Sequence, residues 1–249
     1  MIPRISIITA TFNPSPVVDE CFRSVASQQY PNLQHIVIDG GSSPECFARV
    51  LAHRDRIDVL VHEPDRGISD AWNKGLRHVD GDIVALLNAD DNLLPGALAA
   101  VAHGFRSTGG RAILHGDVIR EEDGRTWRMG SPVPVGWMIY VATPILHPAT
   151  YVPAAVYHQL GGFNETYAVA MDYDFILRAH IAGWPFTRIP EPLVRFRAGG
   201  ISDRRALEGF TDVYRSQCQH GLARCITWPL YRAKMVFRRC IRPLLGMRH

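Results

Sequence analysis

Residues 82–91 read DIVALLNADD, an apolar run followed directly by an amide and two carboxylates. The run 82–87 has the continuous apolar pattern of a buried parallel strand, which ends at Asn88–Asp91. Two further apolar runs lead into polar residues in the same way, 4–10 (RISIITA) into 9–13 and 33–38 (LQHIVI) into 39–43. Because ligands of open α/β sheets bind at the carboxyl ends of the strands, we expect these three polar segments to converge on one crevice.

Helical spacing lies between the strands, for example at residues 68–79 and from Pro95 to Phe105, and strand-like runs recur at 57–61 and 112–115. This alternation predicts an α/β fold with a Rossmann-like, mostly parallel sheet flanked by helices. The pattern changes beyond about residue 117, where we expect short antiparallel strands and a long loop at 118–146, a helix at 172–181, a strand at 186–197 and helices from 205 onward. We therefore predict one domain with a helical C-terminal tail.

The composition is that of a globular protein, with 47% hydrophobic and 20% charged residues among 249. Its five cysteines include no CxxC pair, which argues against a zinc site or a disulfide framework and favours a reducing cytoplasm. The N-terminus has no basic segment followed by an apolar one, so no secretory signal is expected. A dinucleotide-binding GxGxxG after the first strand is absent, which excludes a nicotinamide-dependent oxidoreductase.

Asp90 and Asp91 are adjacent carboxylates that repel each other unless a cation or strong hydrogen bonds compensate. Oxygen ligands suit Mg²⁺ or Mn²⁺, and such an ion can neutralise a leaving diphosphate. The alternative is an Asx-turn that caps the helix beginning near Pro95.

Five sequence blocks in order make the chain resemble family 2 glycosyltransferases of the GT-A fold. They are SIITATFN (6–13), SVASQQY (24–30), IDGGSS (38–43), EPDRGISDAWNKG (63–75) and GD through LNADD (81–91). GGF (161–163) and MDYD (171–174) extend the resemblance into the second half, so that it covers about residues 3–202. The resemblance implies a transferase domain over 1–204, with a nucleotide-binding half at about 1–117, an acceptor half at about 118–204 and a basic tail at 205–249.

The resemblance also implies roles for individual residues. It predicts that the substrate is bound by Thr9, Thr11, Asn13, Asp39, Asp65, Arg66, Asp70, Asn73, Asn88 and Asp90. His147, which follows an apolar loop and precedes Pro148, is a further candidate for substrate binding. Asp90 and Asp91 match the metal-binding element, although Asn88 stands where the family has its first acid. His147 contacts donor or acceptor, or is simply a loop histidine. The segment 199–202 resembles a loop that closes over donor phosphates, but it holds no histidine ligand.

Asp172 matches the second residue of the family's Glu-Asp element, with Met171 at the Glu position. The resemblance makes Asp172 the general base that takes the proton of the acceptor hydroxyl. One base without a covalent nucleophile implies a single displacement and inversion at the anomeric carbon. Asp174 is the rival base, and Asp172 could instead only cap the helix that follows it.

The expected partners are a UDP-, GDP- or dTDP-sugar and a glycan or lipid-linked acceptor of the cell envelope, with no nucleic acid. In the tail, Leu230, Ala233, Phe237, Ile241 and Leu244 share one helical stripe that is distinct from most of the arginines. Such a helix either docks on the domain or lies on the inner face of the plasma membrane. Two other functions stay open, a degenerate sugar-nucleotide-binding or scaffold protein and a nucleotidyltransferase of similar fold.

Overall fold

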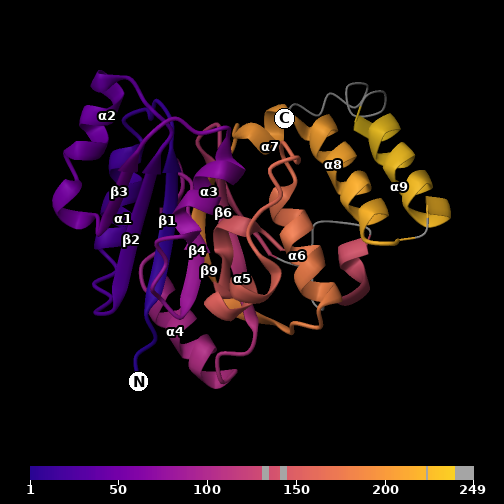
Figure 1. Cartoon of the computed structure of the whole chain (residues 1–249), viewed down its shortest axis with the longest axis horizontal. Coiled ribbons are helices and arrows are strands. Elements are labelled where there is room, and N and C mark those ends of the chain that lie inside the picture. Colours follow the sequence, from indigo (N-terminus) through magenta and orange to yellow (C-terminus); the bar gives the residue numbers. More distant parts are fainter. Residues whose placement is uncertain (131–134, 141–144, 223, 239–249) are drawn as a thin grey trace.

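The computed structural model describes residues 1–130, 135–140, 145–222 and 224–238 (Figure 1). Its strands are β1 Ile5–Thr11, β2 Leu33–Asp39, β3 Val59–His62, β4 Ile83–Leu86, β5 Asn92–Leu93, β6 Ile113–Glu122, β7 Arg125–Met129, β8 Thr150–Pro153 and β9 Phe186–Arg197. Its α-helices are α1 Val18–Ala26, α2 Pro44–Leu51, α3 Ile68–Leu76, α4 Ala97–Ser107, α5 Ala154–Leu160, α6 Met171–Ile181, α7 Ile201–Arg204, α8 Ala206–Gln219 and α9 Arg224–Val236. Short 3₁₀ turns occur at Arg54–Arg56, Gly136–Tyr140 and His147–Ala149.

The strands form one sheet in the order β3-β2-β1-β4-β8-β6-β9-β5, and β7 pairs with β6 beside this path. The first four strands are parallel, as their apolar runs predicted. The second half is mixed, because β8 is antiparallel to both of its neighbours while β6 and β9 are parallel. The α/β prediction is confirmed, and the parallel part of the sheet is the half that ends in the three polar segments.

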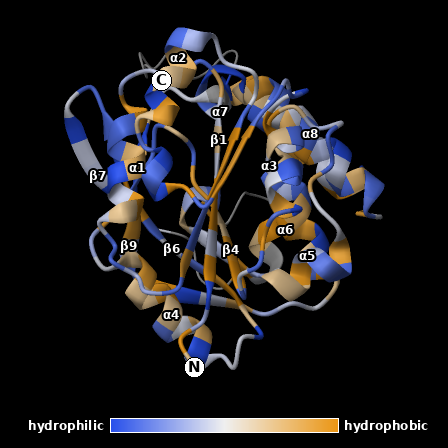
Figure 2. Cartoon of the chain, turned by 60° about the vertical axis from the view of Figure 1, so that its left-hand side comes forward, coloured by the Kyte–Doolittle hydropathy of each residue, from blue (hydrophilic) through white to orange (hydrophobic). Residues whose placement is uncertain are grey.

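Two apolar layers cover the two faces of the sheet (Figure 2). On β1, Ile5 and Ile7 face the layer that includes α1 and α4, whereas Ile8 faces the layer that includes α3 and α6. This alternation follows from the two-residue period of a strand. Helix α3 lies unusually close to β1, since a Cβ added at Gly75 would be only 2.5 Å from Cγ2 of Ile8.

The segment after residue 117 begins with a hairpin, as expected from its sequence. Strand β6 runs on to Glu122, and Asp123 and Gly124 turn the chain with positive φ angles of 50° and 72° into antiparallel β7. Strand β8 and helix α5 were not predicted, because a four-residue strand that ends in proline is too short to show a period.

The C-terminal residues form two helices side by side, α8 against α6 and α9 against α8 (Figure 1). Asp212 of α8 accepts hydrogen bonds from the backbone N–H groups of Ala168 and Val169, both at 2.9 Å, which fixes α8 beside the start of α6. Of the predicted apolar stripe, Ile241 and Leu244 lie outside the described residues. Across the described residues, no helix is both long enough and apolar enough to cross a membrane.

Candidate active site

A crevice of about 770 Å³ opens at the carboxyl ends of β1 and β4. Its walls come from the β1 end, the start of α3, the turn after β4, the 3₁₀ turn at His147, the start of α6 and the segment 196–213. The predicted site residues that line it are Thr11, Asp65, Asn88, Asp90, His147 and Asp172. The topology therefore brings together residues separated by up to 161 positions in the chain, the distance from Thr11 to Asp172.

The two acidic residues after β4 occupy different environments. Asp90 is exposed and lines the crevice, and its carboxylate has no hydrogen bond or ion pair to any residue that the structure describes. Asp91 is fully buried behind it, accepting from the backbone N–H of Arg197 at 3.2 Å and from Nδ2 of Asn88 at 3.1 Å. Of the two carboxylates predicted to hold a cation, only Asp90 lines the crevice in this structure.

Burial, and then the neighbouring charge of Asp90, raises the pKa of Asp91 to about 7. The alternative of an Asx-turn capping the next helix is wrong. Helix α4 begins at Ala97 after Gly96, with no side-chain cap, and β5 lies between it and Asp91.

Asp172 lies in the first turn of α6, where its Oδ1 accepts from the backbone N–H of Tyr173 at 2.8 Å. Its other oxygen, Oδ2, is 3.4 Å from Nδ1 of His147. The rival Asp174 is buried and accepts from Arg178 Nε at 2.9 Å and from Ser216 Oγ at 2.8 Å. Asp174 thus ties α6 to α8, and only Asp172 of the two faces the crevice.

The β1 and β2 ends are joined through Asp39, which is fully buried. Its carboxylate accepts from Thr11 Oγ1 at 2.8 Å and from Ser42 Oγ at 2.6 Å, and lies 2.7 Å from His62 Nδ1. Burial alone would raise the pKa of Asp39, but the hydrogen bonds from Ser42, Thr11 and His62 outweigh it and hold the pKa below its usual value. In this structure Asp39 positions the strand ends, and Thr11 is the residue of this pair that reaches the crevice.

Two predicted donor contacts at this edge have structural roles instead. Thr9 is buried, with Oγ1 at 3.1 Å from Nε2 of His35 on β2. Asn13 accepts from the backbone N–H of Ser43 at 2.9 Å and clamps the two strand ends together. Both side chains lie away from the crevice lining.

The start of α3 places Asp65 in the crevice and Arg66 at its edge. Asp65 Oδ1 accepts from the backbone N–H of Gly67 at 2.8 Å. Arg66 NH2 lies 3.2 Å from Oδ1 of Asp70 and 2.7 Å from Oε2 of Glu165. The hydrogen bond from Arg66 is the largest contribution that lowers the pKa of Asp70. Asp70 therefore fixes Arg66 and the helix start rather than facing the crevice itself.

Asn73, a predicted donor contact, lies outside the crevice lining in this structure. Its side chain makes a two-way contact with Phe163, accepting from the backbone N–H at 2.8 Å and donating to the carbonyl at 2.9 Å. It thereby fastens α3 to the loop before α6, facing a second cavity on the other side of the helix. Helical spacing could place Asn73 on a face but could not show which neighbour occupies that face.

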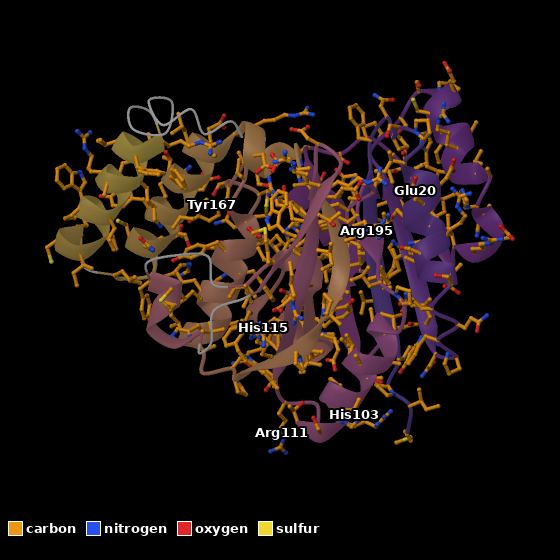
Figure 3. The ribbon with its side chains drawn as sticks, turned by 180° about the vertical axis from the view of Figure 1, so that it is seen from behind. Glu20, His103, Arg111, His115, Tyr167 and Arg195 are labelled. Carbon is orange, nitrogen blue, oxygen red and sulfur yellow. The ribbon has the colours of Figure 1, made fainter. Side chains whose placement is uncertain are left out.

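Sequence reasoning missed three arginines that line the crevice, Arg120, Arg197 and Arg204. Arg197 at the end of β9 pairs with Glu20 of α1, and Figure 3 shows Glu20 and Arg195 on the two elements that this ion pair joins. Arg204 is exposed and has no partner within the described part of the chain. The sequence did offer a signal for two of them, because Arg197 and Arg204 flank the glycine pair at 199–200 that resembles a phosphate-covering loop.

Comparison with known proteins agrees with this geometry. The family model described as glycosyl transferase family 2 matches residues 6–167. An uncharacterized glycosyltransferase of Mycobacterium tuberculosis is 29% identical over 207 residues, which cover 82% of this chain and 78% of that protein. A glycosyltransferase of PGL/p-HBAD biosynthesis from Mycobacterium bovis is 29% identical over 180 residues, covering 71% of this chain and 69% of that protein.

Solved structures share the fold. The crystal structure of Staphylococcus aureus TarS 1–349 has a TM-score of 0.70 at 17% identity and covers 96% of this chain and 73% of that one. A mannosyltransferase from Pyrobaculum calidifontis, solved with GDP-Man and Mn²⁺, has a TM-score of 0.69 at 21% identity and covers 99% of this chain and 73% of that one. The chain thus belongs to glycosyl transferase family 2, and it is a glycosyltransferase with the GT-A fold.

Proposed function

We propose that this enzyme transfers a sugar from a nucleoside diphosphate sugar to an acceptor hydroxyl with inversion, with the help of a divalent cation. The observation that carries the proposal is that two aspartates in different surroundings line one crevice. Asp90 after β4 has no partner among the described residues, and Asp172 on α6 is oriented by a hydrogen bond from the backbone of Tyr173. Each comes from a separate segment of the chain, and a sugar donor lying between them would meet both.

The residues present fit a Mg²⁺ or Mn²⁺ ion. Such ions are commonly held by one or two carboxylates together with substrate phosphates and water. No group of three or more acidic, histidine or cysteine side chains gathers around a common point within the described ranges, so a complete protein cage is not formed there. Asp90 would hold the ion, and the ion would supply charge neutralisation for the departing diphosphate.

Positive charge on the opposite wall supports the same placement of the diphosphate. Arg204, unpaired within the described residues, and Arg197 both line the crevice on the side of the 199–204 segment. Arginine suits phosphate because its guanidinium donates hydrogen bonds in a fixed planar fork. The diphosphate would then lie between Asp90 with its cation and Arg204.

Asp172 would act as the base. Its carboxylate takes the proton of the acceptor hydroxyl while that oxygen forms a bond to the anomeric carbon and the diphosphate leaves with the electron pair of the broken bond. Because Asp174 is buried and bonded elsewhere, no second free carboxylate stands beside Asp172 in the described part of the α6 start. A single displacement with inversion follows from this arrangement.

Several features favour an acceptor that carries an apolar group. The crevice wall beside Asp172 is largely apolar, with Met129, Val169, Phe196, Phe210 and Val213 among its residues. Relatives act in the biosynthesis of PGL/p-HBAD and of O-antigen, the latter an RfbC protein of Myxococcus xanthus that is 31% identical over 214 residues, or 80% of this chain and 16% of that protein. We therefore place the enzyme in cell-envelope glycolipid or polysaccharide assembly.

Helix α9 supports a peripheral position at a membrane. Its exposed side chains include Ile226, Trp228 and Val236, which are 61%, 53% and 46% exposed, and Phe237 just beyond its end is 45% exposed. Arg224 and Arg232 are exposed as well. Exposed apolar side chains interspersed with arginines are typical of helices that lie in the interface of anionic lipid. The inner surface of the plasma membrane, where lipid-linked acceptors are glycosylated, fits these side chains.

A donor panel tests the proposal. UDP-, GDP- and dTDP-sugars are compared by thermal shift and by hydrolysis of the sugar nucleotide, with Mn²⁺, with Mg²⁺ and with chelator. We expect one nucleotide class to stabilise the protein and to be hydrolysed only with the cation, and the anomeric proton of the product to show inversion. Cation-independent turnover, or retention of configuration, would contradict the proposal.

A further inference from the structure

Three side chains from distant segments form a continuous chain at the floor of the crevice. Nδ2 of Asn88, in the turn after β4, lies 3.1 Å from Nε2 of His147. Nδ1 of the same imidazole lies 3.4 Å from Oδ2 of Asp172 on α6. The ring also packs against the buried indole of Trp72, with 5.5 Å between centroids. His147 therefore bridges the acidic element after β4 and the base.

The partners of Asn88 determine which nitrogen of His147 carries the proton. Nδ2 of Asn88 also donates to Oδ2 of Asp91 at 3.1 Å, so the amide nitrogen, not the amide oxygen, faces both groups. An amide nitrogen has two hydrogens and no free acceptor, so the Nε2 atom that faces it must be the unprotonated one. When the ring carries a single proton, that proton is then on Nδ1, the nitrogen 3.4 Å from Oδ2 of Asp172.

The same geometry gives a physical reason for asparagine at position 88, where the resemblance leads one to expect an acid. An aspartate there would oppose the Asp91 carboxylate across 3.1 Å and would have no hydrogen to offer to Nε2 of His147. Asparagine supplies one hydrogen to each neighbour. It joins a carboxylate to an imidazole, which a second carboxylate could not do.

We propose that His147, held by Asn88 in the Nδ1–H form, is a positioning residue that orients the Asp172 carboxylate for proton abstraction. The backbone N–H of Tyr173 holds Oδ1 of Asp172 at 2.8 Å, and Nδ1 of His147 lies 3.4 Å from Oδ2. The carboxylate plane is set before the acceptor arrives, which lowers the cost of reaching the reactive geometry. The role of His147 in catalysis rests on the proposed function. The tautomer of His147 is inferred from its contact with Asn88 and is independent of that function.

The tautomer is tested without turnover. Long-range ¹H–¹⁵N spectra of the ¹⁵N-labelled full chain near neutral pH report the protonation of each ring nitrogen, and His147 is assigned by the signals lost in His147→Gln. We expect an unprotonated Nε2 and a protonated Nδ1 in the wild-type chain, and a change of this pattern in Asn88→Asp. A wild-type ring protonated at Nε2, alone or together with Nδ1, would overturn the inference.

Two substitutions then separate positioning from substrate contact. The amide of His147→Asn reaches the place of Nδ1, whereas the longer His147→Gln reaches that of Nε2. We expect kcat for hydrolysis of the donor to fall about tenfold or more in His147→Gln and distinctly less in His147→Asn, with the donor KM within about twofold in both. His158→Gln, an exposed histidine of α5, is the control and should leave both constants unchanged.

A rise in donor KM with unchanged kcat would assign His147 to substrate binding instead. Equal losses of kcat in both variants would also refute the positioning role. If the donor panel detects no turnover with any nucleotide sugar, the proposed function fails, while the spectra still decide the tautomer.

Discussion

The crevice contains pairs of aspartates that are chemically identical and close in sequence but lie in different surroundings. Asp90 and Asp91 are adjacent in sequence, yet one is exposed and unpaired within the described residues and the other is buried with both oxygens bonded. Asp172 and Asp174 differ in the same way, since only Asp172 faces the crevice. In each pair, one carboxylate is free for chemistry and the other stabilises the segment that presents it.

The Asp90 and Asp91 pair gives a prediction. Asp90→Asn removes the charge that faces the cation, so we expect loss of Mn²⁺-dependent donor binding and turnover lower by on the order of 100-fold. Asp91→Asn keeps the charge of Asp90, so we expect the protein to retain its Mn²⁺-dependent donor binding and its turnover. Thermal shift with and without Mn²⁺ measures the response of both variants. A loss of Mn²⁺ response in Asp91→Asn alone would reverse the assignment.

At the scale of elements, close packing of α3 on β1 positions the helix start and, with it, Asp65 and Arg66. A Cβ at Gly75 would lie 2.5 Å from Cγ2 of Ile8, whereas a Cβ at Gly104 of α4 would meet Leu114 at an ordinary 3.4 Å. Both glycines lie within helices, so the two positions form a matched pair.

We expect Gly75→Ala to destabilise the protein by about 1–3 kcal/mol, because the neighbour is a fully buried side chain in a close-packed core. Gly104→Ala is expected to be neutral or to stabilise by about 0.5–1 kcal/mol through helix propensity. Urea unfolding gives both values. The account of α3 packing would be refuted if the two variants had equal stability.

Helix α9 carries the prediction about the membrane. Replacing Trp228 and Phe237 together by serine removes one exposed apolar side chain of α9 and one just beyond its end, so co-sedimentation with phosphatidylglycerol vesicles is expected to fall severalfold while donor hydrolysis is unchanged. Trp127→Ser is the control, since Trp127 is also exposed but lies on β7. Unchanged sedimentation of the double variant would remove the membrane proposal.

The elements also show how far the sequence alone could be interpreted. Long apolar runs predicted β1, β2 and β4 and hence the edge at which the crevice opens. Short β8, the burial of Asp91 and Thr9 and the contact made by Asn73 could not be predicted, because they depend on partners distant in sequence such as Arg197, His35 and Phe163. Side-chain type and spacing predict where a residue lies in the chain, but not which neighbour fills its bonding capacity.

For the molecule as a whole, buried histidines predict the response to acid. Burial lowers the pKa of His35 and of His115 to about 4, from a usual 6.5. Below pH 6.5 the unfolded chain takes up protons that the native rings refuse, so the stability contributed by these two histidines is lost progressively as the pH falls toward 4. Asp91, whose pKa is raised to about 7, contributes in the opposite direction over the same range, because its native carboxyl takes up a proton before the unfolded one does. The loss is roughly 3 kcal/mol per histidine at most.

Urea unfolding at several pH values measures this loss. His115→Gln is expected to make the free energy of unfolding fall less steeply between pH 6.5 and about 4, the pKa values of His115 in the unfolded and native states. The reason is that glutamine takes up no proton in either state. Asp39 and Asp117, whose pKa values are lowered, act only at more acid pH, because the carboxylates of the unfolded chain begin to take up protons near a pKa of 3.8. A slope identical to that of the wild type would show that His115 is protonated in the native state.

The central claim is that Asp172 removes the acceptor proton while a separate part of the crevice holds the donor. The measurement that tests it most directly is donor binding and turnover of Asp172→Asn, side by side in one preparation. We predict a donor Kd within about twofold of wild type and turnover lower by at least about 100-fold. Turnover at the wild-type rate, or a parallel loss of donor binding, would contradict the account.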